Sequence, residues 1–381
     1  MKYIVNGKIV LPDSILPNSA LAFDEKIIGI TDMKDIPENA EIIDAKGGYV
    51  APGLVDIHIH GYLGEDTSDG KADGIKKMAN GIMKNGVTSW CPTTMTVSMD
   101  EINNALDVVR SLKEESKDWD GAEILGVNLE GPFINPKKKG AQAEEHIKAP
   151  DAKFIIDNAD IISVATMAPE MEGGVEAIKE ICANCAVKVS IGHTDASFED
   201  AMAGIDAGAS HITHLFNAQT GLLHRNPGVV GAALLRDVST ELICDTFHIH
   251  KGLFELIARV KGDHFVLITD CTRAGGMPDG EYTLGGQKII VNGIECLLED
   301  GTIAGSVLKL NNAVKNVRDH TDMPFWKVVA AASLNPARAI GAEDRKGSLE
   351  AGKDADIIIT DDDFNIVKTI IGGKIKYESQ A

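Results

Sequence analysis

The chain has 381 residues, of which 44% are apolar, and its 37 Lys and Arg against 57 Asp and Glu give a formal net charge of −20. This length suits one large α/β barrel with a small additional domain. The acidic balance argues against a nucleic acid or an anionic membrane as partner, because both are bound by basic surfaces. Any anionic substrate therefore has to be held by a few local cations.

Both ends of the chain are predicted to be rich in β-strands. Residues 1–51 contain Asn6-Gly7 between two β-rich pieces, which is a strong signal for a β-hairpin, and further short apolar segments follow. Residues 346–381 contain similar segments, separated by Asp-rich and Gly-Gly turns. Each end is too short to form a domain by itself, so we expect the two ends to build one small β-sandwich domain.

The middle of the chain, residues 52–345, alternates apolar strands with helical stretches, which is the pattern of parallel βα units. Eight strands are predicted, and they end near His60, Thr93, Glu130, Thr166, His193, His214, Asp245 and Asp270. Eight such units predict a closed (β/α)8 barrel, whose active site is expected at the carboxyl ends of the strands. Residues 281–298 are expected to form an inserted β-hairpin.

The first of these strands ends in two histidines, His58 and His60, within the segment Pro52–Gly61. Alternate side chains of a strand point to the same face, so the two imidazoles project together. They are either two exposed histidines at a strand end or two ligands of one metal ion, and this segment alone does not decide between the two.

Four more polar side chains are predicted at later strand ends: Glu130, His193, His214 and Asp270. The carboxyl ends of barrel strands meet on one rim, so these side chains are expected to converge with the histidine pair. His211 lies earlier in its strand, and we expect it to be structural. Imidazole and carboxylate ligands without a thiolate suit Zn²⁺, Fe²⁺, Mn²⁺ or a similar divalent ion, and Glu130 is a candidate bridge between two ions.

A metal centre of this kind favours hydrolysis. It lowers the pKa of bound water from ~15.7 towards ~7 and polarises a carbonyl group. Asp270 is a candidate to take a proton from the attacking water and to deliver it to a leaving nitrogen. The predicted reaction class is therefore hydrolysis of an amide or a similar bond.

These motifs resemble those of the metal-dependent amidohydrolase superfamily. The resemblance rests on His193, His214 and Asp270 and on the segments Asn6–Ile9, Pro52–Gly61 and Gly347–Asp356. A narrower set of motifs resembles the branch of this superfamily that deacetylates phosphorylated amino sugars: Leu129–Phe133, Gly192–Thr194, Thr213–Ala218, Arg273–Gly280 and Ala304–Ser306. Many other members carry a carbamylated lysine where this chain has Glu130.

The resemblance implies hydrolysis of N-acetyl-D-glucosamine 6-phosphate to D-glucosamine 6-phosphate and acetate, in amino-sugar catabolism. It implies one metal site formed by Glu130, His193 and His214. It implies a second site formed by His58, His60, Glu130 and Asp270. Some relatives lack the paired histidines and use one ion, whereas this chain keeps both, so we expect one or two divalent ions such as zinc or iron.

The resemblance also implies the residues that act on the substrate. Asp270 maps onto the catalytic acid and base, and His248 maps onto the histidine that contacts the substrate and polarises the acetyl carbonyl. Substrate-binding positions map onto Ala141, Gln142, Asn217, Ala218, Ile303, Ala304 and Gly305. Some relatives have histidine where Gln142 stands, and glutamine can donate a hydrogen bond there but cannot carry a proton.

Arg225 maps onto the arginine that binds the substrate's phosphate, and in the family this arginine comes from the partner subunit. The resemblance therefore implies a homodimer. It fits the need of an acidic chain for a local cation, since an arginine holds a phosphate through two hydrogen bonds.

The cysteines and the N-terminus bear on the compartment. The six cysteines show no spacing of a disulfide framework, which is typical of a reducing compartment. The first residues lack the apolar core of a signal peptide, and no segment has the apolar length of a membrane-spanning helix. We therefore expect a soluble cytoplasmic protein.

Three alternative functions stay open. The first is deacetylation of the epimer N-acetyl-D-galactosamine 6-phosphate, which needs the same metal chemistry. The second is another amidohydrolase reaction, such as that of a dihydroorotase-like enzyme, against which Arg225 and Glu130-Gly131-Pro132 argue. The third is a barrel that acts as a non-catalytic scaffold, against which the complete set of ligands argues.

Overall fold

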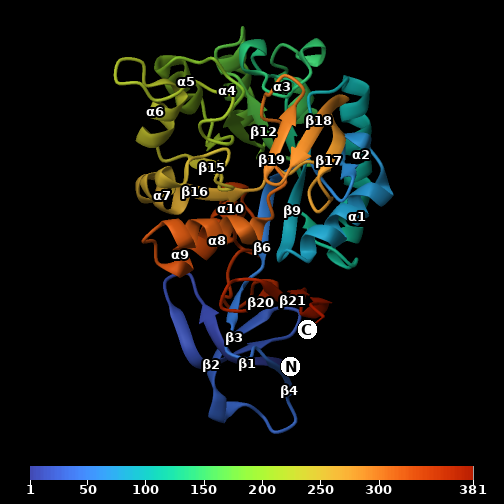
Figure 1. Cartoon of the computed structure of the whole chain (residues 1–381), viewed down its shortest axis with the longest axis vertical. Coiled ribbons are helices and arrows are strands. Elements are labelled where there is room, and N and C mark those ends of the chain that lie inside the picture. Colours follow the sequence, from blue (N-terminus) through green and yellow to red (C-terminus); the bar gives the residue numbers. More distant parts are fainter. Residues whose placement is uncertain (381) are drawn as a thin grey trace.

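The computed structural model describes residues 1–380. Its larger part is a barrel of parallel strands, and Figure 1 shows the smaller sheet made by the two chain ends below that barrel. The barrel strands follow one another in sequence order: β6 (Leu54–Ile59), β9 (Val87–Thr94), β11 (Val127–Glu130), β12 (Ile162–Met167), β13 (Lys188–Ile191), β14 (His211–Ile212), β15 (Ser239–Ile243) and β16 (Phe265–Ile268).

The barrel closes between its first and last strands. An isolated parallel bridge pairs Ile59 with Cys271, and the backbone N–H of Asp270 donates to the carbonyl of His58 at 2.9 Å. β6 and β9 are buried along their whole length, because one face of each strand lines the barrel interior and the other lies under helices. This confirms the (β/α)8 barrel that the sequence predicts.

Helices cover the outside of the barrel, and local sequence signals mark where some of them start. Capping boxes at Ser98 and Ser197 begin α2 (Met99–Lys113) and α5 (Phe198–Asp206), and α2 buries apolar residues at the three- and four-residue spacing of an amphipathic helix. The helices are α1 (Ala72–Met83), α2 (Met99–Lys113), α3 (Ala152–Asp157), α4 (Gly174–Asn184), α5 (Phe198–Asp206), α6 (Gly228–Leu235), α7 (Phe254–Lys261), α8 (Leu310–His320), α9 (Phe325–Ala331) and α10 (Leu334–Ala339). No helix among residues 1–380 is both long enough and apolar enough to cross a membrane.

The two chain ends share one eight-stranded sheet around a separate apolar core. Its strands are β1 (Lys2–Val10), β2 (Ile15–Phe23), β3 (Ile27–Asp32), β4 (Glu41–Asp44), β5 (Tyr49–Pro52), β20 (Ile357–Thr360), β21 (Ile366–Ile371) and β22 (Lys374–Glu378). β5 pairs with β1 on one side and with β20 on the other, so it joins the N-terminal strands to the C-terminal ones. β5 leads into β6, and the carboxyl ends of the barrel strands therefore face away from this sheet.

The hairpin predicted at Asn6-Gly7 is wrong, because β1 runs straight through this dipeptide. Asn6 has a positive φ of 56°, and the pairing of β1 with β2 shifts register on both sides of Gly7. A Cβ on Gly7 would lie 2.5 Å from Val50 Cγ2, so a close approach of β5 requires glycine there. The Asn-Gly signal therefore marks a β-bulge inside one strand and not a turn between two strands.

The segment expected to be an inserted hairpin is instead a three-stranded antiparallel sheet. Its strands are β17 (Gly280–Leu284), β18 (Gln287–Asn292) and β19 (Glu295–Leu298). The second turn lies at Gly293, which adopts a positive φ of 61° without the steric penalty that a Cβ atom would cause. Two further short strands, β7 (Gly61–Tyr62) and β8 (Glu65–Asp66), pair with each other just beyond β6.

A buried ion-pair network, which we call the Lys346 cluster, connects the barrel to the sheet of the chain ends. Lys346 Nζ lies 2.5 Å from Glu123 Oε2, 2.9 Å from Asp354 Oδ2 and 2.7 Å from Asp356 Oδ2. Glu123 belongs to β10 (Glu123–Ile124), which pairs with β9 at the amino end of the barrel. Arg345 adds contacts of 3.0 Å to Glu123 and 2.7 Å to Asp354.

Candidate metal centre and active site

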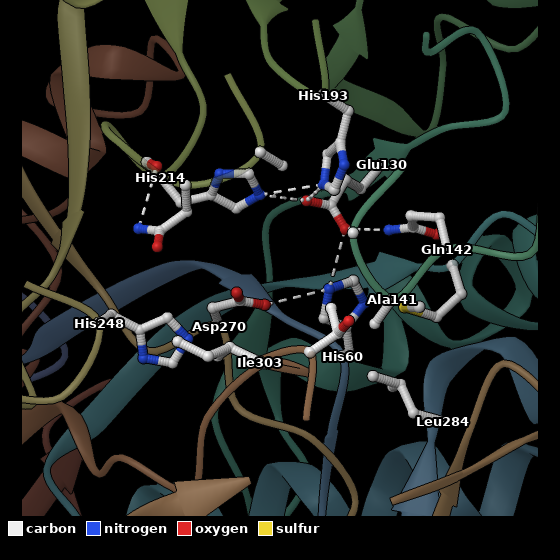
Figure 2. Close-up of a pocket in the computed structure, with 16 residues that line it drawn as sticks. His60, Glu130, Ala141, Gln142, His193, His214, His248, Asp270, Leu284 and Ile303 are labelled. Carbon is white, nitrogen blue, oxygen red and sulfur yellow. Dashed lines mark hydrogen bonds and ion pairs between the residues drawn. The ribbon is translucent and has the colours of Figure 1, made fainter. Parts of the chain in front are cut away.

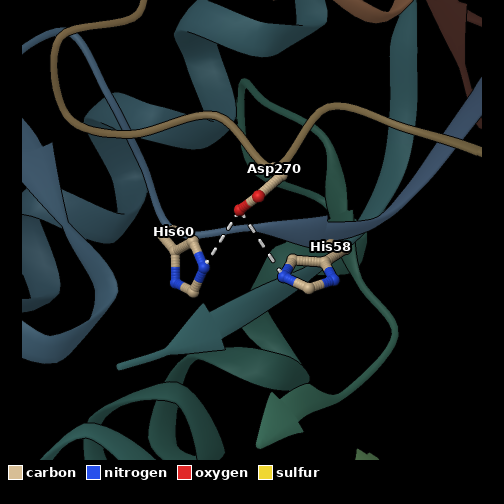
Figure 3. A group of neighbouring side chains, drawn as sticks. All are labelled: His58, His60 and Asp270. Atoms are coloured by element: carbon tan, nitrogen blue, oxygen red, sulfur yellow. Dashed lines mark ion pairs between the residues drawn. The ribbon is translucent and has the colours of Figure 1, made fainter. Parts of the chain in front are cut away.

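The first and last barrel strands bring together one group of candidate metal ligands. His58 lies in β6, His60 follows it, and Asp270 follows β16. Asp270 Oδ1 lies 3.2 Å from His60 Nε2 and 3.7 Å from His58 Nε2 (Figure 3). All three side chains are buried, and one ligand atom from each lies within 4.8 Å of the others.

Glu130, His193 and His214 form a second group, at the ends of β11, β13 and β14. Glu130 Oε1 lies 3.1 Å from His193 Nε2 and 2.9 Å from His214 Nε2 (Figure 2). The backbone of His193, His214 and Asp270 has positive φ angles of 47°, 24° and 49°. Non-glycine residues rarely adopt such angles, and strained positions of this kind cluster at functional sites.

Glu130 also joins the two groups. Its Oε1 lies 3.3 Å from His58 Nε2, and its Oε2 lies 3.1 Å from His60 Nε2. Burial alone raises the pKa of this carboxyl group, but the neighbouring imidazoles, His58 and His193 foremost, hold the pKa well below its ordinary value. Glu130 is therefore negatively charged at the centre of four imidazoles.

The donor set fits a divalent cation. His193 Nε2 and His214 Nε2 face each other at 3.1 Å, a distance at which two ring nitrogens need a proton or a cation between them. His58 Nε2 is buried and has no hydrogen-bond partner within residues 1–380. Nitrogen and oxygen ligands without a thiolate suit zinc, iron and similar ions.

The far sides of two of these imidazoles, those of His193 and His58, lie against fixed acceptors. His193 Nδ1 lies 2.9 Å from the carbonyl oxygen of Lys138, so the Lys137–Lys139 run contributes its backbone to the site. His58 Nδ1 lies 3.0 Å from Glu241 Oε2. Burial by itself raises the pKa of Glu241, but its contacts with His58 and His211 lower the pKa below its ordinary value. His211 Nε2 lies 3.0 Å from Glu241 Oε1, and His211 belongs to neither group of candidate ligands.

A cavity of about 280 Å³ opens above the two groups. Besides candidate ligands it is lined by Met95, Gly140, Ala141, Gln142, Asn217, Ala218, His248, Leu284, Thr302, Ile303 and Gly305. Figure 2 shows His248 and Ile303 beside Asp270, with Ala141 and Gln142 on the side of Glu130. None of the residues that line it is a lysine or an arginine.

His248 is held by its neighbour Asp245 at the end of β15. Asp245 Oδ2 lies 2.6 Å from His248 Nδ1, and Asp245 Oδ1 accepts the backbone N–H of His248 at 2.8 Å. This fixes the ring and leaves its Nε2 free to face the cavity.

Gln142 is less available to a ligand than the sequence suggests. Its Nε2 donates to Glu130 Oε2 at 2.7 Å, and its Oε1 accepts the backbone N–H of Thr96 at 2.6 Å. The side chain is buried, so within this chain Gln142 orients Glu130 as well as lining the cavity.

Two of the predicted substrate-binding residues, Ala304 and Arg225, do not line the cavity. Ala304 is fully buried between Ile303 and Gly305. Arg225 lies in the exposed loop 221–226, where its Nη1 is 2.8 Å from His224 Nε2. Sequence reasoning missed Met95, Gly140, Leu284, Thr302 and Glu241. Of these only Glu241 carries a signal, as a lone carboxylate inside the otherwise uncharged strand Ser239–Ile243.

The profile of the Amidohydrolase family matches residues 49–376 of the chain. An N-acetylglucosamine-6-phosphate deacetylase of Bacillus subtilis (strain 168) is 38% identical over 98% of this chain and 96% of its own length. An N-acetylgalactosamine-6-phosphate deacetylase of Escherichia coli O157:H7 is 34% identical over 91% of this chain and 92% of its own length.

Solved structures match over nearly the full chain. N-acetylglucosamine-6-phosphate deacetylase from Pasteurella multocida has a TM-score of 0.94 at 31% identity and covers 99% of this chain and 100% of that chain. A mutant N-acetyl-D-glucosamine-6-phosphate deacetylase from Mycobacterium smegmatis, in complex with N-acetyl-D-glucosamine-6-phosphate, has a TM-score of 0.91 at 25% identity and covers 98% and 99%. The similarity therefore extends over the barrel and over the sheet of the chain ends.

Proposed function

The chain belongs to the amidohydrolase family, and on this premise we propose that it hydrolyses N-acetyl-D-glucosamine 6-phosphate to D-glucosamine 6-phosphate and acetate. The observation that carries the proposal is the convergence of four imidazoles on Glu130 at the floor of a cavity. Relatives and solved structures named for this deacetylation, over nearly the whole chain, support the substrate.

We propose that the centre holds one or two divalent ions, zinc or iron. Glu130, His193 and His214 would hold the first ion. His58, His60 and Asp270, with Glu130 shared, would hold the second. Such ions supply a Lewis acid and lower the pKa of water, which makes a nucleophile available at neutral pH.

Asp270 is proposed as the acid and base of the reaction. It reaches the cavity and lies 3.2 Å from His60, so it can accept a proton from the attacking water. The same carboxyl group then delivers that proton to the amide nitrogen as the C–N bond breaks. The products are the free amine of the sugar and acetate.

His248 is proposed to hold the acetyl carbonyl. Because Asp245 engages Nδ1, the ring can offer Nε2–H to the carbonyl oxygen when both ring nitrogens carry a proton. A donor aimed at that oxygen stabilises the negative charge that develops on it during attack.

The sugar is proposed to lie against two segments of the cavity wall. Asn217 and Ala218 form one of these segments, and Ile303 and Gly305 form the other. Ala141 and Gln142 complete the wall near Glu130.

Arg225 is proposed to bind the phosphate in the partner subunit of a homodimer. Support comes from a cavity with no lysine or arginine in its lining, although its proposed ligand is a dianion. Support also comes from the loop that carries Arg225, where Leu222 and Leu223 are exposed. Exposed apolar side chains beside an exposed arginine are typical of a protein interface.

The second candidate is the galactosamine epimer, which the Escherichia coli relative favours. The test is to load the metal-free protein with zinc or with iron and measure amine release from both epimers. The proposal predicts the higher kcat/KM for the glucosamine epimer. A higher kcat/KM for the galactosamine epimer would make that epimer the preferred substrate. Hydrolysis of neither epimer would contradict both candidate functions.

A further inference from the structure

Glu241 is a carboxylate beneath the metal centre that the proposed reaction does not use. It lies in the middle of β15 with none of its surface exposed. Its Oε2 is 3.0 Å from His58 Nδ1 and accepts the backbone N–H of His214 at 3.0 Å, and its Oε1 is 3.0 Å from His211 Nε2. Burying a charge inside a barrel is unfavourable unless hydrogen bonds compensate it, and here three are available.

We propose that Glu241 is a positioning residue for both halves of the metal centre. It fixes which ring nitrogen His58 presents, and it holds the backbone of His214 at the end of β14. This inference rests on the metal centre of the proposed function.

The first part of the inference follows from hydrogen-bond chemistry. An ionised carboxylate accepts hydrogen bonds and cannot donate one, so Nδ1 of His58 carries the proton. In the neutral ring Nε2 then presents its lone pair toward Glu130 Oε1, 3.3 Å away, and Asp270 Oδ1, 3.7 Å away. A partner that fixes the tautomer and the ring orientation is what a histidine ligand needs.

The second part follows from a shared atom. The same Oε2 binds a residue from each group of ligands, His58 from one and His214 from the other. His214 has a φ of 24°, an angle that a non-glycine residue keeps only when its surroundings hold it. The bond from its N–H to Glu241 is one such contact.

Positioning by hydrogen bonds can be separated from a simple need for negative charge. Glu241→Gln keeps the length of the side chain without the charge. Its amide oxygen can take the place of Oε2, and its NH₂ group can donate to His211 Nε2 once the proton of that ring moves to Nδ1. Nδ1 of His211 has no partner within residues 1–380, so this exchange breaks no existing bond.

Glu241→Asp makes the opposite change. It keeps the charge but shortens the side chain by one C–C bond, about 1.5 Å. A carboxylate withdrawn by that distance cannot reach His58 Nδ1 and the N–H of His214 together. If Glu241 acts by positioning, the glutamine variant should bind zinc like the wild type, and the aspartate variant should not.

The experiment measures zinc binding and needs no turnover. Metal-free wild type and both variants are loaded with zinc sulfate and dialysed, bound zinc is counted, and affinity is measured against a chelator of known strength. Loss of a partner of a metal ligand costs about 10- to 100-fold in metal affinity, so we expect a loss of this size for Glu241→Asp. For Glu241→Gln we expect less than a threefold change.

Thr240→Val is the matched control in the same strand. Thr240 is equally buried, and its hydroxyl donates only to the carbonyl of Val238. Its loss should lower the melting temperature without changing zinc affinity, which separates destabilisation of β15 from loss of positioning.

Several outcomes would overturn the inference. They are wild-type affinity in Glu241→Asp, a loss in Glu241→Gln as large as in Glu241→Asp, and a matching loss in Thr240→Val. A wild type that retains no zinc would instead contradict the metal centre itself, so the two failures are distinguishable.

If Glu241→Asp does not fold, the tautomer of His58 in the wild-type protein tests the inference instead. The NMR spectrum is recorded on zinc-loaded protein with ¹⁵N-labelled histidine. The His58 ring signal is the one that is missing from the spectrum of His58→Gln. That ring should carry its proton on Nδ1, and a proton on Nε2 would overturn the inference.

Discussion

Two buried clusters of ionisable side chains lie at opposite ends of the barrel, and they differ in how their charges are balanced. In the Lys346 cluster two cations face three carboxylates, and Lys346 has an oxygen of each carboxylate within 2.9 Å. In the metal centre four imidazoles surround two carboxylates, and two ring nitrogens lie 3.1 Å apart.

The comparison separates a structural cluster from a functional one. A buried charge is tolerated when opposite charges or hydrogen bonds compensate it, which the Lys346 cluster achieves with its own residues. The metal centre brings ligand atoms together in a way that only an added cation compensates fully. Convergence of lone pairs, and not burial or charge alone, therefore marks the site of chemistry.

The largest effect is expected from removing the cation. His193→Ala, His214→Ala or exhaustive chelation should abolish nearly all deacetylation, because each removes a ligand or the ion itself. The measurement is amine release together with bound metal per chain. Full activity of the chelated protein would contradict the distinction between a structural cluster and a functional metal centre.

Asp270→Asn should lower kcat by about 10²- to 10⁴-fold, the usual contribution of a positioned acid or base. The amide keeps the size of the side chain, so metal and phosphosugar should still bind. Metal content and ligand binding are measured beside kcat. A correctly loaded Asp270→Asn protein with near-normal kcat would show that another group moves the proton.

Arg225→Ala should raise KM for the phosphorylated sugar by roughly 10- to 150-fold, the value of one charge-assisted hydrogen bond of about 1.5–3 kcal/mol. KM for unphosphorylated N-acetylglucosamine should change little, because it offers the guanidinium no partner. Equal changes for both sugars would contradict the phosphate role.

The same arginine tests the homodimer. Mixing Arg225→Ala chains with Asp270→Asn chains should restore activity, since one site of each hybrid dimer then has an intact base and an intact arginine. Failure to recover activity after verified subunit exchange would rule out donation from the partner.

His58→Gln combined with His60→Asn should weaken the second ion while Glu130, His193 and His214 keep the first. Zinc content should fall towards one ion per chain, with part of the activity retained. Loss of both ions to the same extent would mean that the centre does not divide in this way.

Lys346→Met should leave kcat nearly unchanged and destabilise the fold. Removing one partner of a buried ion pair typically costs ~3–5 kcal/mol, because the remaining carboxylates stay buried. Denaturant unfolding measures this loss. Lys153→Met is the control, because Lys153 pairs with Asp157 on an exposed helix surface and should not matter measurably.

The Lys346 cluster also predicts a pH dependence of stability. Burial alone lowers the pKa of Lys346, but Asp356, Glu123 and Asp354 raise the pKa well above its ordinary value. A raised folded-state pKa contributes stability below the unfolded value of about 10.4, and that stability is lost as the pH rises through the folded value. Wild type should thus lose stability above about pH 10.4, and Lys346→Met should lose less.

The sequence predicts the barrel and the candidate ligands because both follow simple periodic rules. Parallel strands bring their carboxyl ends to one rim, so polar residues there converge even when 212 positions separate His58 from Asp270. His58, His60, Glu130, His193, His214 and Asp270 all lie together in the structure.

Contacts that depend on exact packing could not be predicted in this way. Gln142 is hydrogen-bonded to Glu130, and Glu241 is hydrogen-bonded to His58. The strand pattern does not determine the directions of these side chains. Asn6-Gly7 suits a turn and a bulge equally well, and only the approach of β5 to Gly7 decides for the bulge. Tertiary packing, and not local preference, determines these positions.

The most direct test of the account is a metal titration of the apo protein with N-acetyl-D-glucosamine 6-phosphate as substrate. Acetate release should be absent without metal, rise with bound zinc or iron, and reach its maximum at one to two ions per chain. Full activity without metal, or no acetate release at full loading, would contradict the central claim that this cluster is a metal centre for deacetylation.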